Sequence, residues 1–464
     1  MDSARQVARV TDLPRNCHAR ATSLRCNSAV AHTLRHAARP LPAGFHVIIA
    51  AQFLSALADN ALLIVTIAWL QRTGQPEWWT PLLKFFFIAS YVGLAPMVGA
   101  VADSMCKARV MAWTNGIKLA GAVTLGCGLQ PLAAFALVGF GAAAYAPAKY
   151  GLITELVPPH RLVNANAWIE VTVVGAVLLG TACGGLLVSD LFASWLAVAA
   201  LDRWLAGLSF GPGGGLSAAL LLIVATYVGA WVVNLRIRRT GAVPLPIPRH
   251  PARLLREFWA ANRILWRDAG GGRLSLAVTS LFWGAGAVLQ FAVLRWATDH
   301  LDMSLSSAAY LQAAVALGVI GGAAYAGQRI GLAQAPRLML AGVALGLLVA
   351  LGSWIHSIPM AAMLMITVGG VGGLLLVPMN ALLQHRGYRL LSAGRSIAVQ
   401  GFNENASILL MLAGYALLIR AEVPVTPLML GFGLSIAVAM ALLAWRFRAM
   451  VAAAAPERLA PVRR

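Results

Sequence analysis

The sequence is poor in charged residues, and poorest in acidic ones. Only 11% of its 464 residues are charged, and 16 Asp and Glu stand against 36 Lys and Arg, which gives a formal net charge of +20. Hydrophobic residues make up 59% of the chain. A soluble globular domain with this balance would expose apolar surface to water, so the composition excludes that class and favours a chain buried in a lipid bilayer.

Cysteine is also scarce. The chain has five, and they include no CxxC pair: Cys17, Cys26, Cys106, Cys127 and Cys183. Neither a disulfide framework nor a metal site is predicted from them. No histidine has an aspartate at HxxxxD spacing, and we expect no enzymatic chemistry and no cofactor. Basic residues are scattered between apolar segments instead of gathered on one module, which argues against nucleic-acid binding.

Long apolar runs are what the sequence has in abundance. A spanning helix needs about 20 mostly apolar residues, and we find twelve such runs, at 44–70, 81–102, 109–129, 131–152, 164–188, 216–235, 274–298, 306–328, 337–356, 359–383, 395–419 and 425–446. The stretch 191–215 is amphipathic and ends in a glycine-rich hinge, so we expect it to lie at the membrane surface. The sequence therefore predicts an all-α membrane protein with twelve transmembrane helices.

The charges of the loops predict the orientation of these spans. If both termini are cytoplasmic, four of the 36 basic residues lie outside and three lie within spans: Arg72, Lys84, Arg203 and Arg420 outside, and Lys118, Lys149 and Arg295 within. All other Lys and Arg then fall on the cytosolic side, as the positive-inside rule requires. We expect a multi-pass protein with cytoplasmic N- and C-termini.

The longest connection divides the spans into two halves. Residues 236–273 hold nine arginines and predict a cytoplasmic linker with an amphipathic helix, between six-helix halves at 44–235 and 274–446. The arginines and tryptophans of this linker suit anionic lipid headgroups, although the positive-inside rule alone explains them equally well. We expect a disordered basic tail at 1–43 and a cytoplasmic tail at 447–464.

The halves repeat one another weakly. FLSALADNALL near Phe53 aligns with LFWGAGAVLQF near Phe282, and GAAAYAPAKYG from Gly141 aligns with GGLLLVPMNAL from Gly372, both at an offset of about 230 residues. Parallel six-span repeats that hold substrate between them are the plan of the major facilitator superfamily. The sequence predicts that fold, with two pseudo-symmetric halves.

A loop between the second and third spans resembles the signature of that superfamily. In GAVADSMCKAR, a glycine is followed by an aspartate and by basic residues: Gly99, Asp103, Lys107 and Arg109. The glycine allows helices to approach closely, and the aspartate can cap a helix and pair with basic groups in one state only. We predict that these four residues form a gate.

Several charges lie inside the predicted spans, where each costs about 2.5–3.5 kcal/mol on insertion scales. They are Asp59, Lys118, Lys149, Glu170 and Glu404. For Lys118, Glu170 and Glu404, pairing that holds the bundle together is as good an explanation as substrate binding. Asp59 and Lys149 occupy repeat-related positions in spans that line the cavity of this superfold, so we predict a substrate role for both.

Seven motifs along residues 51–445 resemble the bacterial lysophospholipid transporter family. They are AQFLSALADNALL, LAPMVGAVADS, NGIKLAG, GAAAYAPAKYG, TSLFWGAG, VPMNALLQHRG and NENASILLML. The resemblance implies a facilitator in the bacterial inner membrane that moves lysophosphatidylethanolamine and lysophosphatidylglycerol from the outer to the inner leaflet without energy coupling. A cytosolic acyltransferase/acyl-ACP synthetase would then reacylate them. We expect a monomer.

The resemblance also implies a substrate site. Asp59 and Lys149 fall on polar cavity residues of that family, and Asn60, Lys118 and Glu404 match further motif positions. The family carries an arginine where this chain has Gln290, and Arg295 lies about 140° further around the helix. We expect lysolipid phosphate at Lys149, with Arg295 or Gln290 assisting, and the amine or glycerol at Asp59 and Asn60.

An alternative function is a proton-coupled exporter of amphipathic drugs or other lipophilic solutes. Such a transporter would use Asp59 or Glu170 as a carboxylate that takes up a proton. The sequence leaves both functions open, and collapse of the proton gradient would affect transport only in the exporter.

Overall fold

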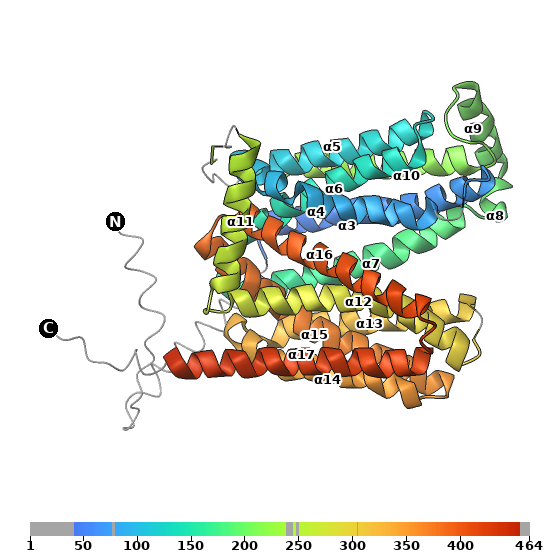
Figure 1. Cartoon of the computed structure of the whole chain (residues 1–464). Helices are drawn as coiled ribbons and strands as arrows, with labels where there is room; N and C mark the ends of the chain where they lie inside the picture. Colours follow the sequence, from blue (N-terminus) through green and yellow to red (C-terminus); the bar gives the residue numbers. More distant parts are fainter. Residues whose placement is uncertain (1–40, 77–78, 238–244, 247–249, 304, 455–464) are drawn as a thin grey trace, which may run out of the picture. The chain divides into compact units, whose positions relative to one another are not determined.

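The computed structural model describes residues 41–76, 79–237, 245–246, 250–303 and 305–454. Within these ranges the regular elements are all helical (Figure 1). Twelve elements coincide with the twelve predicted spans: α3 (Ala43–Arg72), α4 (Trp79–Ser104), α5 (Lys107–Gly126), α6 (Pro131–Leu156), α7 (Leu162–Leu187), α10 (Leu216–Leu235), α12 (Gly272–His300), α13 (Leu305–Arg329), α14 (Met339–Leu351), α15 (Ile358–Leu390), α16 (Ala393–Arg420) and α17 (Val425–Ala454). The predicted all-α class is confirmed.

Eleven of these segments are long and apolar enough to cross a membrane. The twelfth, α5, is less apolar because Arg109, Asn115 and Lys118 interrupt it. It nevertheless packs between α6 and α10, and the bundle buries Asn115 and Lys118 almost completely. Polar side chains that face neighbouring helices avoid contact with lipid, so α5 needs a less apolar sequence than its neighbours.

The ambiguous stretch after α7 forms two short helices. They are α8 (Asp190–Ala193) and α9 (Leu196–Gly207), of which α9 is the longer, with 12 residues. At a rise of about 1.5 Å per residue, α9 extends over about 18 Å, well short of the roughly 30 Å of hydrocarbon in a bilayer. This stretch therefore does not add a thirteenth crossing.

The repeated motifs fall on equivalent helices. Pro147 lies inside α6 and Pro378 lies inside α15, and each of these is the fourth long helix of its half. In the second half, the backbones of α13 and α15 are almost in contact where the two helices cross. A Cβ atom on Gly322 would overlap the carbonyl oxygen of Gly370, so only glycine fits there. Close crossing at small residues is the usual way that helices associate in a bilayer.

The predicted boundaries of the terminal segments differ from the helices. The predicted tail at 1–43 lies outside the described residues except for its last three positions, and α17 runs on to Ala454 instead of ending near 446. Alanine is the best helix former, and the alanines at 449–454 extend α17 by that preference. Residues 455–464 lie outside the described part.

The linker helix α11 (Pro251–Arg267) lies across one end of the bundle (Figure 1). Its buried residues Phe258, Ala261 and Leu265 form one apolar cluster with residues of α4, α12, α15 and α16. We call this end, where α4 ends and α5, α7, α12 and α16 begin, the latch end. The opposite end, which carries α8 and α9, is called the far end.

Asp268 fixes the junction between α11 and α12 to α15. Its carboxylate accepts hydrogen bonds from Arg386 Nη2 at 2.6 Å and Nε at 3.0 Å, from the Gly272 N–H at 2.8 Å and from the Gly270 N–H at 3.2 Å. Partial burial alone would raise the pKa of Asp268, but these hydrogen bonds outweigh it and hold the pKa below its usual value.

This pKa predicts how stability depends on pH. A lowered pKa stabilises the fold above the unfolded value of about 4, and this contribution disappears as the pH falls through the folded value. Asp268→Asn is therefore expected to lower the thermal unfolding midpoint by a few degrees at pH 7, and its difference from the wild type should shrink as the pH falls toward 3. Detergent-solubilised protein can be unfolded at both pH values, with the exposed Asp302→Asn as control. A midpoint difference as large at pH 3 as at pH 7 would contradict the assignment.

Candidate functional site

Asp103, at the end of α4, bonds to the start of α16 in the other half. Its carboxylate accepts from the N–H groups of Gly394 at 2.8 Å and Arg395 at 3.0 Å, and also from the Ser392 hydroxyl. The first N–H groups of a helix have no partner within the helix, and a carboxylate satisfies them and complements the helix dipole. Asp103 therefore caps α16 and joins the two halves.

Gly99, one turn before Asp103, lets α4 and α16 approach closely. A Cβ atom at this position would lie 2.8 Å from Ala398 Cβ and 3.1 Å from Arg395 Cα. The first distance is shorter than real Cβ atoms show and the second is tighter than most Cβ contacts, so any larger residue would push α4 away from α16. The glycine and the aspartate of the sequence signature thus lie in the same contact between the halves.

Lys107 lies beside this contact, and Arg109 does not. The Lys107 ammonium is 2.6 Å from Glu155 at the end of α6 and 3.6 Å from Asp103. Arg109 is exposed on the outer side of α5. Of the four residues predicted to form a gate, the structure gathers Gly99, Asp103 and Lys107 and leaves Arg109 outside.

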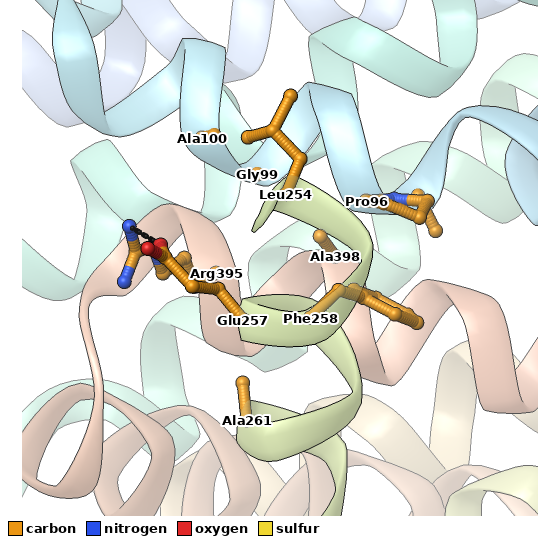
Figure 2. A pocket seen from close by; sticks show the side chains of 10 residues that line it. Pro96, Gly99, Ala100, Leu254, Glu257, Phe258, Ala261, Arg395 and Ala398 are labelled. Carbon is orange, nitrogen blue, oxygen red and sulfur yellow. Dashed lines mark hydrogen bonds and ion pairs between the residues drawn. The ribbon is translucent and has the colours of Figure 1, made fainter. Parts of the chain in front are cut away.

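The linker helix covers the same contact. Figure 2 shows Glu257 of α11 paired with Arg395 of α16, and the Arg395 Nη2 to Glu257 Oε2 distance is 2.9 Å. The cavity that remains between α4, α11 and α16 has a volume of about 10 Å³, room for one water molecule at most. The halves are therefore tightly packed at the latch end.

Further hydrogen bonds between the halves lie at the same end. Asn166 of α7 and Gln384 of α15 exchange two bonds of 2.9 Å between their amides. Asn164 Nδ2 donates to the Gly327 carbonyl oxygen of α13 at 3.2 Å. Together with the Asp103 cap, they define what we call the latch: the bonds of Asp103, Asn164 and Asn166 to the second half.

Asp59 is the acceptor of a polar network within the first half. Lys118 Nζ lies 2.6 Å from Asp59 Oδ2, and the Tyr227 hydroxyl donates to Asp59 Oδ1 at 2.6 Å. Lys118 also donates to the Ser55 hydroxyl at 2.6 Å, and Ser55 donates to Asn115 Oδ1 at 2.8 Å. These residues come from α3, α5 and α10, so the network ties three helices together.

The position of Lys118 makes this pair a buried one. Lys118 is 2% exposed, and its ammonium lies 5.6 Å from the ring centre of Tyr227 and 5.8 Å from that of Tyr145. The Asp59 side chain is 17% exposed. A buried ammonium needs its counter-charge, so the charge of Asp59 is already matched inside the chain.

Lys149 differs because no acid pairs with it. Its ammonium lies 4.1 Å from the ring centre of Tyr150, and in the part of the chain that the structure describes no carboxylate is within ion-pair distance of it. Lys149 is 7% exposed. Glu170 of α7 acts on it only over a longer range.

Glu170 and Glu404 extend this charged group across both halves. Glu170 is buried on α7, and Glu404 of α16 accepts a hydrogen bond from Gln400 at 2.8 Å. Both carboxyl groups lie near enough to act electrostatically on the Tyr150 hydroxyl beside Lys149. The structure thus brings one cation and two carboxylates of different halves into a common electrostatic environment.

The remaining predicted site residues lie apart from Lys149. Asn60 donates to the Ala56 carbonyl oxygen of its own helix at 2.8 Å. Gln290 is exposed and accepts at its backbone oxygen from Gln312 at 2.5 Å. Arg295 pairs with Asp299, one turn further along α12, at 3.1 Å. These contacts are local: they lie within α3, within α12, or between α12 and α13.

Sequence reasoning missed several partners. Ser55, Tyr227 and Ser392 carry hydroxyl groups that complete the Asp59 network and the Asp103 cap. A hydroxyl inside an apolar helix gives no separate sequence signal, because it can equally bond to the preceding turn. Glu170 had a signal, its charge within a span, that did not distinguish a site from a structural pair.

One short pattern matches an enzyme motif by its letters. Residues Gly207, Ser209 and Gly211 fit GxSxG, and Ser209 is exposed with a φ of +54°. The motif acts in hydrolases only between a strand and a helix, whereas here it follows α9 and lies in a glycine-rich turn. The described residues also contain no group of three or more His, Cys, Asp or Glu that could hold a metal ion.

Comparison with curated proteins finds close relatives along most of the chain. The lysophospholipid transporter LplT of Citrobacter koseri is 41% identical over 409 residues, which cover 88% of this chain and 96% of the relative. The protein of that name from Salmonella arizonae is 40% identical over 401 residues, 86% of this chain and 94% of the relative. No family model matches.

Solved structures share the fold at low sequence identity. The Escherichia coli fucose:proton symporter FucP superposes with a TM-score of 0.66 at 13% identity, covering 87% of this chain and 98% of the symporter. A bacterial homologue of the iron transporter ferroportin, in an outward-facing state, has a TM-score of 0.63 at 13% identity, with 87% and 99% covered. The predicted major facilitator fold is confirmed.

Proposed function

Because the chain belongs to the family of lysophospholipid transporters, we propose that it carries lysophospholipids across a bacterial inner membrane by exposing one site alternately to each side. The observation that supports this function most is Lys149. A buried ammonium without a carboxylate partner is costly in a membrane, and the phosphate of a lysolipid headgroup would supply the missing charge through charge-assisted hydrogen bonds.

The proposal includes a direction of transport. The excess of Lys and Arg on the latch side supports a cytoplasmic latch end and cytoplasmic termini. The latch then closes the cytoplasmic side, and the lysolipid enters sideways from the outer leaflet, with its acyl chain in an apolar groove. Opening of the latch releases it to the inner leaflet, where a cytosolic acyltransferase removes it, so no coupling ion is needed.

Roles for the other polar residues follow from their surroundings. Glu170 acts on Lys149 and Glu404 acts on the neighbouring Tyr150, and both carboxylates suit the amine of a phosphatidylethanolamine-type headgroup. Asp59 and Asn60 remain proposed contacts for the amine or glycerol, but Asp59 would have to share its charge with Lys118. Gln290 and Arg295 would act only at the approach to the site.

Lys149→Gln is expected to lower lysolipid transport by about tenfold or more, because a lost charge-assisted bond is worth roughly 1.5–3 kcal/mol. Lys149→Arg should retain most of the activity, since the positive charge remains. The measurement is uptake of lysophosphatidylethanolamine and lysophosphatidylglycerol by proteoliposomes. Lys84→Gln, the same change at an exposed lysine of α4, is the control. Unchanged uptake with Lys149→Gln would refute the site.

The alternative, a proton-coupled exporter, draws support from Glu170 and Glu404. Two carboxylates within the membrane next to a lysine are a common arrangement for proton transfer. Imposing a proton gradient across the same proteoliposomes and collapsing it with a protonophore separates the two functions. Uptake that continues unchanged supports the facilitator, and uptake that stops supports the exporter.

A further inference from the structure

A second hollow lies on the outer side of the first half, between α5 and α10. It has a volume of about 660 Å³, within the range of small-molecule sites. Its floor is a row of small residues four positions apart on α5: Ala108, Ala112, Gly116 and Ala120. Residues at this spacing lie on one face of a helix. We call this hollow the α5–α10 groove.

Two tryptophans form its walls. Trp113 of α5 is 67% exposed and Trp231 of α10 is 37% exposed, and both line the groove. A Cβ atom on Gly116 would meet nothing closer than Trp231 Nε1 at 3.9 Å. The groove is therefore open because small residues and spaced aromatic rings face one another, and not because the helices have separated.

The groove has the length of one lipid leaflet. Its lining runs along α5 from Cys106 to Ala120. At about 1.5 Å per residue, this stretch rises by about 21 Å. One leaflet together with its headgroup region is about 20–22 Å thick. An extended acyl chain lying along the floor would thus keep its headgroup at the level of Cys106 and Arg109.

That end of the groove is prepared for an anion. Arg109 lines it, and among the described residues no acid lies within ion-pair distance of its guanidinium. The groove also reaches the N-terminus of α5, a helix of 20 residues with no side-chain cap and no acid in its first turn. The helix dipole and an arginine together favour a phosphate.

We propose that the α5–α10 groove binds one two-chain phospholipid of the surrounding bilayer. Its phosphate contacts Arg109 and the N-terminus of α5, one acyl chain lies along the small-residue floor, and the other chain stays among the bulk lipids. The site is formed by the first half alone, so it does not rest on the proposed transport function. Arg109 lies two residues after Lys107, so the bound phospholipid stabilises that end of α5.

The test is native mass spectrometry of the full-length protein in detergent, titrated with dioleoylphosphatidylglycerol. Parallel titrations use dioleoylphosphatidylethanolamine, dioleoylglycerol without a phosphate, and single-chain lysophosphatidylglycerol. One copy of either two-chain phospholipid should bind, and dioleoylglycerol should bind at least about tenfold more weakly, because the phosphate carries the charged contacts. Tighter binding of the single-chain lipid that Arg109→Gln weakens would overturn the proposal, because it would place the single-chain lipid in the groove, whereas single-chain binding that only Lys149→Gln weakens belongs to the proposed transport site.

Variants locate the bound lipid. Arg109→Gln should weaken phosphatidylglycerol binding about tenfold, and Gly116→Leu, which fills the floor, should abolish it. Matched controls are Arg256→Gln, at an exposed arginine of α11, and Gly185→Leu, at an exposed glycine of α7 with open space around it. Equal binding by Arg109→Gln and wild type overturns the proposal, as does equal weakening by Arg109→Gln and Arg256→Gln. Arg109 is exposed, so its variant should fold even if Gly116→Leu does not.

Discussion

Asp59→Asn is expected to destabilise the protein strongly, by roughly 3–5 kcal/mol, the usual effect of breaking a buried ion pair. The variant leaves Lys118 charged at 2% exposure, with only neutral oxygens near its ammonium. It also removes the charge to which the Tyr227 hydroxyl donates. The measurement is the thermal unfolding midpoint in detergent, which is monitored as the loss of monodisperse protein on heating.

Lys118, the ion-pair partner of Asp59, provides the control. In the double variant Asp59→Leu with Lys118→Met, no charge is left buried, and much of the lost stability should return because an apolar pair of similar volume often replaces a buried ion pair without loss. If Asp59→Asn transports poorly but unfolds at the wild-type temperature, Asp59 acts on substrate and not as a structural partner. If the double variant is less stable than Asp59→Leu alone and Lys118→Met alone, the pair does not behave as described.

Asp103→Asn is expected to open the latch end. Asparagine keeps the shape but loses the negative charge that accepts from Ser392, Gly394 and Arg395, and hydrogen bonds to a charged group contribute about 1.5–3 kcal/mol each in favourable cases. A loss of about 3 kcal/mol would change the ratio of closed to open latch more than a hundredfold. Transport should fall as well, since one of the two states becomes rare.

The opening can be measured at Ala398, which is buried against Gly99. A cysteine placed there, with the native cysteines replaced by serine, should react slowly with a maleimide in the closed latch and much faster when Asp103 is asparagine. Asp190→Asn, at an exposed aspartate of the far end, is the control. Equal labelling rates in the three proteins would mean that the Asp103 bonds do not hold the halves together.

The fold was largely predictable from the sequence, and the exceptions have physical causes. The apolar runs predict the long helices because lipid-facing residues must be apolar. Even α5 was found, although Lys118 and Asn115 make it less apolar than its neighbours. Helix ends were less predictable: α17 runs on to Ala454, since nothing in its alanine-rich end stops a helix.

The candidate site was predictable only in part. Charge within a span singles out Asp59, Lys118 and Lys149, but which of them pair depends on how α3, α5 and α6 are rotated. Neighbouring charges in separate helices have no sequence spacing that reveals their contact. Asp59 and Lys118 belong together, and among the described residues no acid forms an ion pair with Lys149. Arg109 follows the signature in sequence, yet the helical turn places it on the outer face of α5.

The latch influences how the empty carrier is distributed between its closed-latch and open-latch states. Three bonds of the latch end on one carboxylate, and the two amide bonds of Asn166 and Gln384 add to them. A ligand can shift a two-state equilibrium only by its differential affinity, and about 5.5 kcal/mol is needed to move it from 1:99 to 99:1. For the proposed facilitator, which has no external energy source, any shift between the two states can come only from the bound lysolipid. Sequence changes at one or two latch positions would therefore tune which leaflet the empty carrier faces while leaving the headgroup site intact.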